Sequence, residues 1–202
     1  MFCQEILHGE GSDNFTGHVL DNTTGEQVAV LKQEFDEVEY TRQMYCLGKY
    51  YNTALIGIEA NYTTYPIQEL ERLQYPKQFI RKKEDKYTKK LDKAYGFKTT
   101  SVTRPLILGQ LQTILKECIE LIVDIDTLKE ALTFIKNEKG RAEAQQGYHD
   151  DLIMALAIAY YIRTQQEMKV KTKEKIIRDN MYKDFGIKDD IESDYGSTIP
   201  VI

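Results

Sequence analysis

The sequence has few cysteines and no long apolar run, and each shortage excludes a class of protein. Its three cysteines among 202 residues are scattered and odd in number, which fits neither a disulfide framework nor a zinc site and indicates the reducing cytosol. The longest apolar run, residues 152–162, is too short to cross a bilayer. Residues 1–10 lack the basic start and apolar stretch of a signal peptide. We therefore expect a cytoplasmic protein.

The sequence also lacks an excess of positive charge and a phosphate-binding loop. Its 27 Lys and Arg residues and 32 Asp and Glu residues give a net charge of -5 at pH 7. This balance does not indicate a nucleic-acid binder, although a nuclease needs only a local basic track beside an acidic metal site. A phosphate-binding loop requires Gly-x-x-x-x-Gly-Lys-Ser/Thr, whereas Gly48-Lys49 is followed by Tyr50 and lacks the earlier glycine. The chain is therefore not expected to be an ATPase of that class.

What remains is the composition of an ordinary globular domain with an appended tail. Hydrophobic residues make up 42% and charged residues 29% of the chain, which is long enough to bury a core. There is no internal repeat and no low-complexity stretch. We expect one domain over residues 1–166. Residues 167–202 are predicted to form a charged C-terminal helix and a flexible acidic tail.

The order of the predicted elements indicates an α/β domain with a mixed β-sheet. Strands are predicted at residues 15–20 and 27–31, separated by the turn Asp21-Asn22-Thr23-Thr24-Gly25, and a buried strand at residues 53–58. Asp126 is expected to cap a helix. The other expected elements are a short strand at residues 78–80, a loop at residues 140–147, and helices at residues 35–51, 66–73, 104–120, 126–134 and 150–164.

Acidic residues stand at the ends of two buried elements. Glu59 follows the predicted buried strand, and Asp150 and Asp151 follow His149 at the start of the apolar helix. Two-metal hydrolysis of phosphodiesters needs carboxylates that converge from different elements and hold divalent ions about 3.5–4 Å apart. Mg²⁺ and Mn²⁺ prefer such oxygen ligands. The pattern is compatible with a two-metal site.

Each acid also has a purely structural interpretation. Glu59 fits a rim residue where its strand leaves the core. Asp150 and Asp151 fit an N-cap and a first-turn acid that complements the helix dipole. His149 alone is more often structural than catalytic. No single residue decides between these interpretations.

Four segments, taken in order, carry a family resemblance. They are the hairpin with its Gly9-Glu10-Gly11 loop and Thr24-Gly25-Glu26 turn, Ile58-Glu59-Ala60-Asn61, Thr103-Arg104-Pro105-Leu106, and Gly147-Tyr148-His149-Asp150-Asp151-Leu152. Together they resemble the C-terminal nuclease domain of phage large terminase subunits, over roughly residues 9–164. The last segment is the most specific match.

The resemblance implies a ribonuclease-H-like fold, a mixed β-sheet flanked by helices, and a two-metal endonuclease that uses Mg²⁺ or Mn²⁺. Such an enzyme cuts concatemeric double-stranded DNA during phage packaging. Carried over by position, Glu59 is the second metal-binding acid and Asp151 the third. Asp150 remains an alternative ligand or a cap, and His149 belongs to the same catalytic motif. The implied partners are double-stranded DNA, the portal or procapsid, the ATPase half of terminase and the small terminase subunit. No membrane is involved, and the implied location is the cytoplasm of a host cell that carries a phage or prophage.

The chain departs from the family at the first acid. That residue belongs on the opening strand before the glycine-rich loop, a position that falls near Ile6; Glu5, Glu10 and Asp13 are only nearby. Residues 1–8 do not resemble the expected strand. One hypothesis is a truncated or split terminase whose first strand is lost or replaced. The alternatives are a catalytically impaired remnant or interaction module, and another ribonuclease-H-like enzyme such as a junction resolvase or transposase.

A basic run supplies the candidate DNA contacts. Dense Lys and Arg can follow a phosphate backbone, and the binding then weakens steeply with salt. The alternative is a solvated connecting hairpin. Residues 169–183 fit either a docking helix for the portal or procapsid, or a solvated helix. The candidate DNA-binding residues are Arg81, Lys82, Lys83, Lys86, Lys89 and Lys90.

Overall fold

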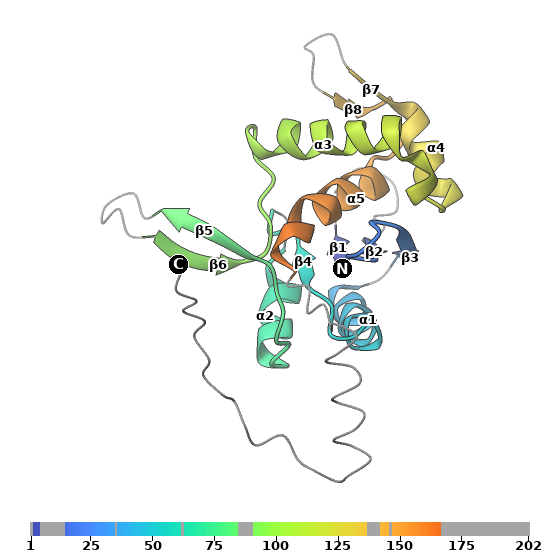
Figure 1. Ribbon diagram of the computed structural model, residues 1–202. Helices are drawn as coiled ribbons and strands as arrows, with labels where there is room; N and C mark the ends of the chain where they lie inside the picture. The colour runs from blue at the N-terminus through green and yellow to red at the C-terminus, as the bar shows by residue number, and fades with distance from the viewer. Residues whose placement is uncertain are drawn as a thin grey trace, which may run out of the picture. The chain divides into compact units, whose positions relative to one another are not determined.

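A computed structural model describes most of the first 166 residues (Figure 1). The described residues belong to one compact unit that spans Met1–Glu167. None of their helices is long and apolar enough to cross a membrane. The predicted C-terminal helix and tail, residues 167–202, lie outside the described residues. The described ranges are 2–4, 15–34, 36–61, 63–84, 91–136, 142–145 and 147–166.

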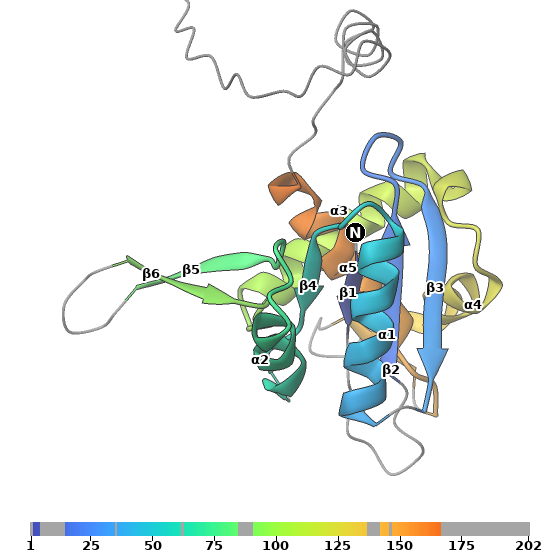
Figure 2. The same ribbon diagram turned by 90° about the horizontal axis from the view of Figure 1, so that it is seen from below.

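The central strands combine parallel and antiparallel pairing. β1 (Phe2–Gln4) pairs in parallel with β4 (Ile56–Ile58), and Gln4 lies opposite Ile58. On its other side β1 contacts β2 (Phe15–Leu20), which pairs antiparallel with β3 (Gln27–Gln33). Figure 2 shows the four strands side by side in the order β4, β1, β2, β3. Residues 1–8, which do not resemble the expected first strand in sequence, nevertheless include this short strand.

Helices cover both faces of these strands. On one face, α1 (Glu37–Tyr50) and α2 (Tyr65–Arg72) pack with Phe15, Ile56 and Ile58 in one apolar cluster. On the other, α3 (Thr103–Glu117) and α5 (Asp151–Ile162) form a second cluster (Figure 1). The mixed sheet flanked by helices, predicted from the sequence, is confirmed.

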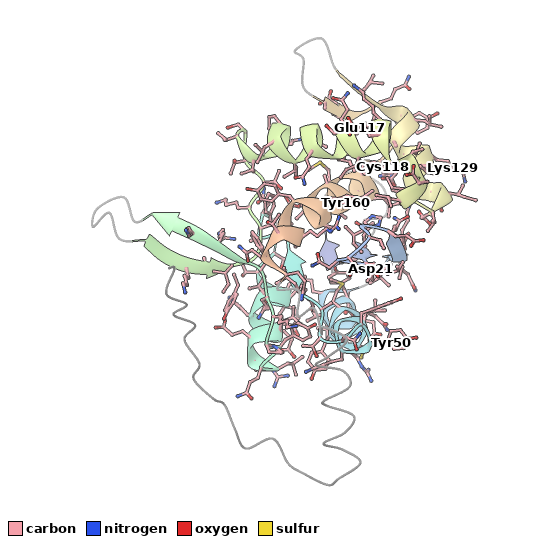
Figure 3. All side chains as sticks on the ribbon, viewed as in Figure 1. Asp21, Tyr50, Glu117, Cys118, Lys129 and Tyr160 are labelled. Carbon is pink, nitrogen blue, oxygen red and sulfur yellow. The ribbon has the colours of Figure 1, made fainter. Side chains whose placement is uncertain are left out.

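α5 lies deep between its neighbours. All of its residues except Tyr161 are buried, which explains why it is apolar on every side. A Cβ on Gly57 of β4 would lie only 2.1 Å from Ile162 Cδ1, so glycine lets the end of α5 pack against that strand. Tyr160 donates a hydrogen bond of 2.8 Å to the Gly25 carbonyl, in the turn that follows Asp21 (Figure 3).

β2 links the two apolar clusters because its side chains alternate between the two faces. Phe15 stacks on Tyr40 of α1 with ring centroids 4.8 Å apart. Thr16 and His18 instead bind the backbone of α5. The strand is buried along its whole length as a result.

The smaller elements correct three predictions. Residues 140–147 were expected to form a loop, but β8 (Ala142–Ala144) pairs with β7 (Phe134–Lys136). The strand predicted at residues 78–80 instead begins at Ile80: β5 (Ile80–Glu84) pairs with β6 (Leu91–Tyr95) in a hairpin that projects from the sheet (Figure 2).

The third correction is the cap of α4 (Ile125–Thr133). The side chain of Asp124, not of Asp126, accepts a hydrogen bond of 2.7 Å from the Thr127 amide. Asp124 has the extended backbone of a cap residue, whereas Asp126 lies in the first turn of the helix. Short 3-10 turns, Ile119–Leu121 and Arg163–Gln165, follow α3 and α5.

Candidate active site

Glu59 lies directly after β4, as the sequence predicts. The backbone on either side of it is fixed by two hydrogen bonds of 2.7 Å, from the Ala60 amide to the Phe97 carbonyl and from the Phe97 amide to the Ile58 carbonyl. The residue is only 3% exposed. The structure therefore places this carboxylate inside the domain and not on a solvated rim.

The surroundings of Glu59 disfavour its charge. Burial raises the pKa of Glu59 to about 7; the Thr99 hydroxyl and Arg104 oppose this rise, and Asp150 adds to it. Among the described residues, its Oε2 atom has no hydrogen-bond partner. A buried carboxylate with a free acceptor atom is a group that a bound cation would stabilise.

Asp150 is paired with a residue that the sequence reasoning missed. Nη2 of Arg104, in the first turn of α3, lies 2.7 Å from Asp150 Oδ2, and the two side chains are only 14% and 9% exposed. The positive charge of Arg104 also lowers the pKa of Glu59, against the effect of burial. The Thr103-Arg104-Pro105 segment was recognised only as the start of a helix. The arginine in this segment was the feature of the sequence that could have assigned the segment to the site.

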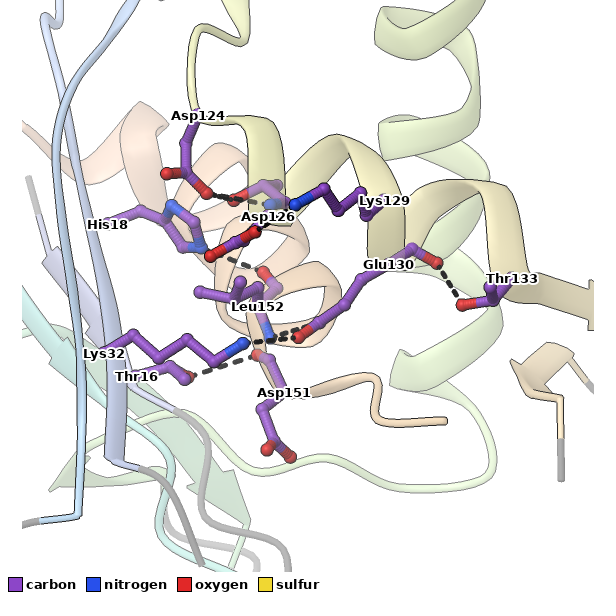
Figure 4. Close-up of polar contacts among 11 residues, drawn as sticks. Thr16, His18, Lys32, Asp124, Asp126, Lys129, Glu130, Thr133, Asp151 and Leu152 are labelled. Carbon is purple, nitrogen blue, oxygen red and sulfur yellow. Dashed lines mark hydrogen bonds and ion pairs between the residues drawn. The ribbon is translucent and has the colours of Figure 1, made fainter. Parts of the chain in front are cut away.

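Asp151 is the first residue of α5 and is 3% exposed. Its backbone carbonyl accepts a hydrogen bond of 3.2 Å from the Thr16 hydroxyl of β2. Its carboxylate points away from the nearby Lys32–Glu130 pair (Figure 4). The structure thus buries both adjacent aspartates, at the same helix start.

His149, Arg81 and Lys82 are more exposed than the buried acids Glu59, Asp150 and Asp151. His149 is exposed in the segment before α5. Nη1 of Arg81 donates to the carbonyls of Tyr95 and Gly96, at 3.0 and 2.8 Å, so this guanidinium stabilises the hairpin itself. Lys82 is exposed on β5. The side chain of Lys83 is not described, and Lys86, Lys89 and Lys90 lie outside the described residues.

The described residues have the chemistry of part of a metal site. Glu59 and Asp151 supply the oxygen ligands that Mg²⁺ or Mn²⁺ prefers. Within the described ranges, however, no three His, Cys, Asp or Glu side chains gather as a metal-binding group. Glu5, Glu10 and Asp13 lie outside those ranges. Glu59 and Asp151 are thus oxygen donors of the kind that a divalent cation takes, without a metal-binding group of three such side chains among the described residues.

Comparisons with solved structures identify the fold. The large terminase nuclease from thermophilic phage G20c matches with a TM-score of 0.56 and 17% identity, over 80% of this chain and 81% of that chain. A structure of that nuclease with bound magnesium has a TM-score of 0.58 and 17% identity, with 80% of each chain covered.

The large terminase nuclease domain of Thermus phage P74-26 matches with a TM-score of 0.57 and 18% identity, over 84% of this chain and 81% of that chain. No protein-family model and no curated protein matches the sequence. The chain has the ribonuclease-H-like fold of terminase nuclease domains, which confirms the predicted fold class.

Proposed function

We propose that this chain is the nuclease domain of a phage DNA-packaging terminase, a metal-dependent endonuclease that cuts concatemeric double-stranded DNA. The observation that carries the proposal is Glu59, buried at the end of β4 with a pKa near 7 and close to the Arg104–Asp150 pair. Perturbed carboxylates of this kind are typical of catalytic sites. The likeness to terminase nucleases supports the same function.

The proposed cofactor is Mg²⁺ or Mn²⁺ in a two-metal site. Glu59 and Asp151 are the proposed ligands, with Asp150 as the alternative to Asp151. Such ions supply an activated nucleophile and stabilise charge on the leaving oxygen. The large terminase nuclease from phage G20c has been solved with bound cobalt and with bound magnesium, which supports a divalent cation.

The register of β1 suggests the missing first acid. Gln4 of β1 lies opposite Ile58 of β4 in a parallel pair, and the residues that follow them in the sequence are Glu5 and Glu59. We propose Glu5 as the third ligand, in place of the position near Ile6 that counting from the glycine-rich loop gave. Glu5 itself lies outside the described residues, so this assignment rests on the register of its neighbour.

The proposed nuclease function also implies where the chain acts and with which partners. The chain would act in the cytoplasm of a host cell, on double-stranded DNA, together with the portal or procapsid, the ATPase half of terminase and the small terminase subunit. His149 remains a proposed member of the catalytic motif. Its exposure on the segment before α5 makes it available to bound DNA.

Cleavage of supercoiled plasmid tests the nuclease. We expect the purified chain to nick and linearise plasmid with Mn²⁺, and Glu59→Ala, Asp151→Ala and Glu5→Ala each to lower the rate at least about 100-fold, since each removes a ligand. Glu71→Ala, an exposed acid on α2, is the matched control and should cut normally. A folded wild-type chain without metal-dependent cleavage would instead favour the impaired remnant or interaction module.

A further inference from the structure

The first turn of α5 is not capped by its own N-cap residue. Helix N-termini leave backbone amides without intrahelical partners, and an Asp at the N-cap usually accepts from one of them. Asp150 occupies the N-cap position, yet its side chain makes no capping hydrogen bond. Its carboxylate binds Arg104 instead. The capping acceptor therefore has to come from another element.

Glu130 of α4 supplies that acceptor. Its Oε2 atom accepts a hydrogen bond of 2.9 Å from the Leu152 amide, and Lys32 Nζ of β3 lies 3.4 Å from its Oε1 atom (Figure 4). Glu130 is 8% exposed. Burial raises its pKa, and Lys32 and the amides of Leu152 and Ile153 oppose that rise. A buried acid is tolerated here because both its oxygens have partners.

Two side chains of β2 hold the carbonyls of the same turn. The Thr16 hydroxyl donates to the Asp151 carbonyl, and His18 Nε2 lies 2.9 Å from the Leu152 carbonyl. Gln27 Oε1 accepts from two backbone amides, so its Nε2 must be the donor to His18 Nδ1, 2.8 Å away. That arrangement makes His18 Nε2 the protonated nitrogen.

The first turn of α5 is thus fixed from β2 and α4 while the Asp151 carboxylate points away from these contacts (Figure 4). We propose that Glu130 is a positioning residue for Asp151. By capping α5 in place of Asp150, it leaves Asp150 to Arg104 and aims Asp151 at the metal. This role rests on the proposed nuclease function, because it requires Asp151 to be a ligand.

Mn²⁺ binding measured by calorimetry tests this role directly. We expect Glu130→Ala to weaken Mn²⁺ binding about 10–100-fold, the usual loss when a residue that orients a ligand is removed. Glu130→Gln should keep most of the affinity, because its amide oxygen can still accept from Leu152.

A metal-free readout accompanies the titration. Amide hydrogen exchange at Leu152 should be faster in Glu130→Ala and close to wild type in Glu130→Gln. Asp124→Ala is the matched control: it removes the side-chain cap of α4 and lowers the melting temperature, but leaves the first turn of α5 intact. It should therefore retain wild-type Mn²⁺ affinity.

Several results would overturn the role. A folded Glu130→Ala variant with wild-type Mn²⁺ affinity would do so, as would an equal loss in Asp124→Ala or in Glu130→Gln. If Glu130→Ala does not fold, Glu130→Asp replaces it: its shorter side chain should lose the contact and the affinity. A wild-type chain that neither binds Mn²⁺ nor cuts DNA would refute the nuclease function itself, whereas an active wild type with unaffected Glu130 variants would refute only the positioning.

Discussion

At the scale of single residues, Glu59 shows what burial does to a carboxylate before a metal binds. Its pKa of about 7, against an ordinary value of 4.5, results mainly from desolvation. The folded metal-free protein therefore holds this proton more tightly than the unfolded chain does. The contribution of Glu59 to the free energy of unfolding therefore falls as the pH rises from about 4.5 to about 7.

Glu59→Gln should remove this dependence, because glutamine keeps the shape without the charge. In metal-free buffer we expect the variant to gain stability relative to wild type between pH 5 and pH 8. The pKa difference corresponds to at most about 3 kcal/mol. Urea unfolding at the two pH values measures it. Glu71→Gln, on the exposed face of α2, should show no such gain, and parallel curves for wild type and Glu59→Gln would contradict the assignment.

Arg104 and Glu130 also belong to the residue scale, because each one decides what a neighbouring aspartate does. Arg104 binds Asp150 with a 2.7 Å contact, and Glu130 accepts from the amide that Asp150 leaves uncapped. The sequence showed two adjacent acids at a helix start and left ligand and cap open. These two contacts from α3 and α4 show that the Asp150 side chain binds Arg104 and does not cap α5.

At the scale of elements, the β5–β6 hairpin concentrates positive charge on two paired strands. Lys82 lies opposite Lys93 in the antiparallel register, and both are exposed. Like charges directly opposite each other destabilise a strand pair, so this pairing weakens the hairpin unless an anion lies near it. A DNA backbone would supply that anion.

Replacing both lysines should weaken DNA binding. We expect Lys82→Ala/Lys93→Ala to bind double-stranded DNA several-fold more weakly, and the slope of log affinity against log salt to fall in magnitude by up to about 2, since each phosphate contact contributes about 0.9. Fluorescence anisotropy across a salt series measures both. Lys129→Ala on α4 is the control. An unchanged salt slope would mean that the hairpin is only a solvated connection.

At the scale of the whole molecule, a bound cation should stabilise the fold. The proposed ligands come from separate elements, Glu59 after β4 and Asp151 at the start of α5, so the unfolded chain cannot present them together. A ligand at 100 times its dissociation constant stabilises the folded state by about 2.7 kcal/mol. We expect excess Mn²⁺ to raise the melting temperature of the wild type by several degrees, but not that of Glu59→Ala/Asp151→Ala. Equal shifts in both proteins would place the metal elsewhere.

The sequence by itself determined the features that depend on local pattern. The hairpin of β2 and β3, the position of Glu59 after a buried strand and the buried helix that starts at Asp151 all follow from alternation, turn residues and apolar runs. The resemblance of ordered motifs then gave the ribonuclease-H-like fold. These features can be predicted because residues close together in the sequence are enough to produce them.

Only the tertiary structure decided the rest. β1 was missed because three residues carry too little pattern, and it is recognised by its parallel pairing with β4, far along the chain. The roles of Arg104 and Glu130 depend on contacts with Asp150 and Leu152, 46 and 22 positions away. The raised pKa of Glu59 depends on burial by elements that close over it. Such effects arise from packing between distant segments, and no local pattern in the sequence encodes them.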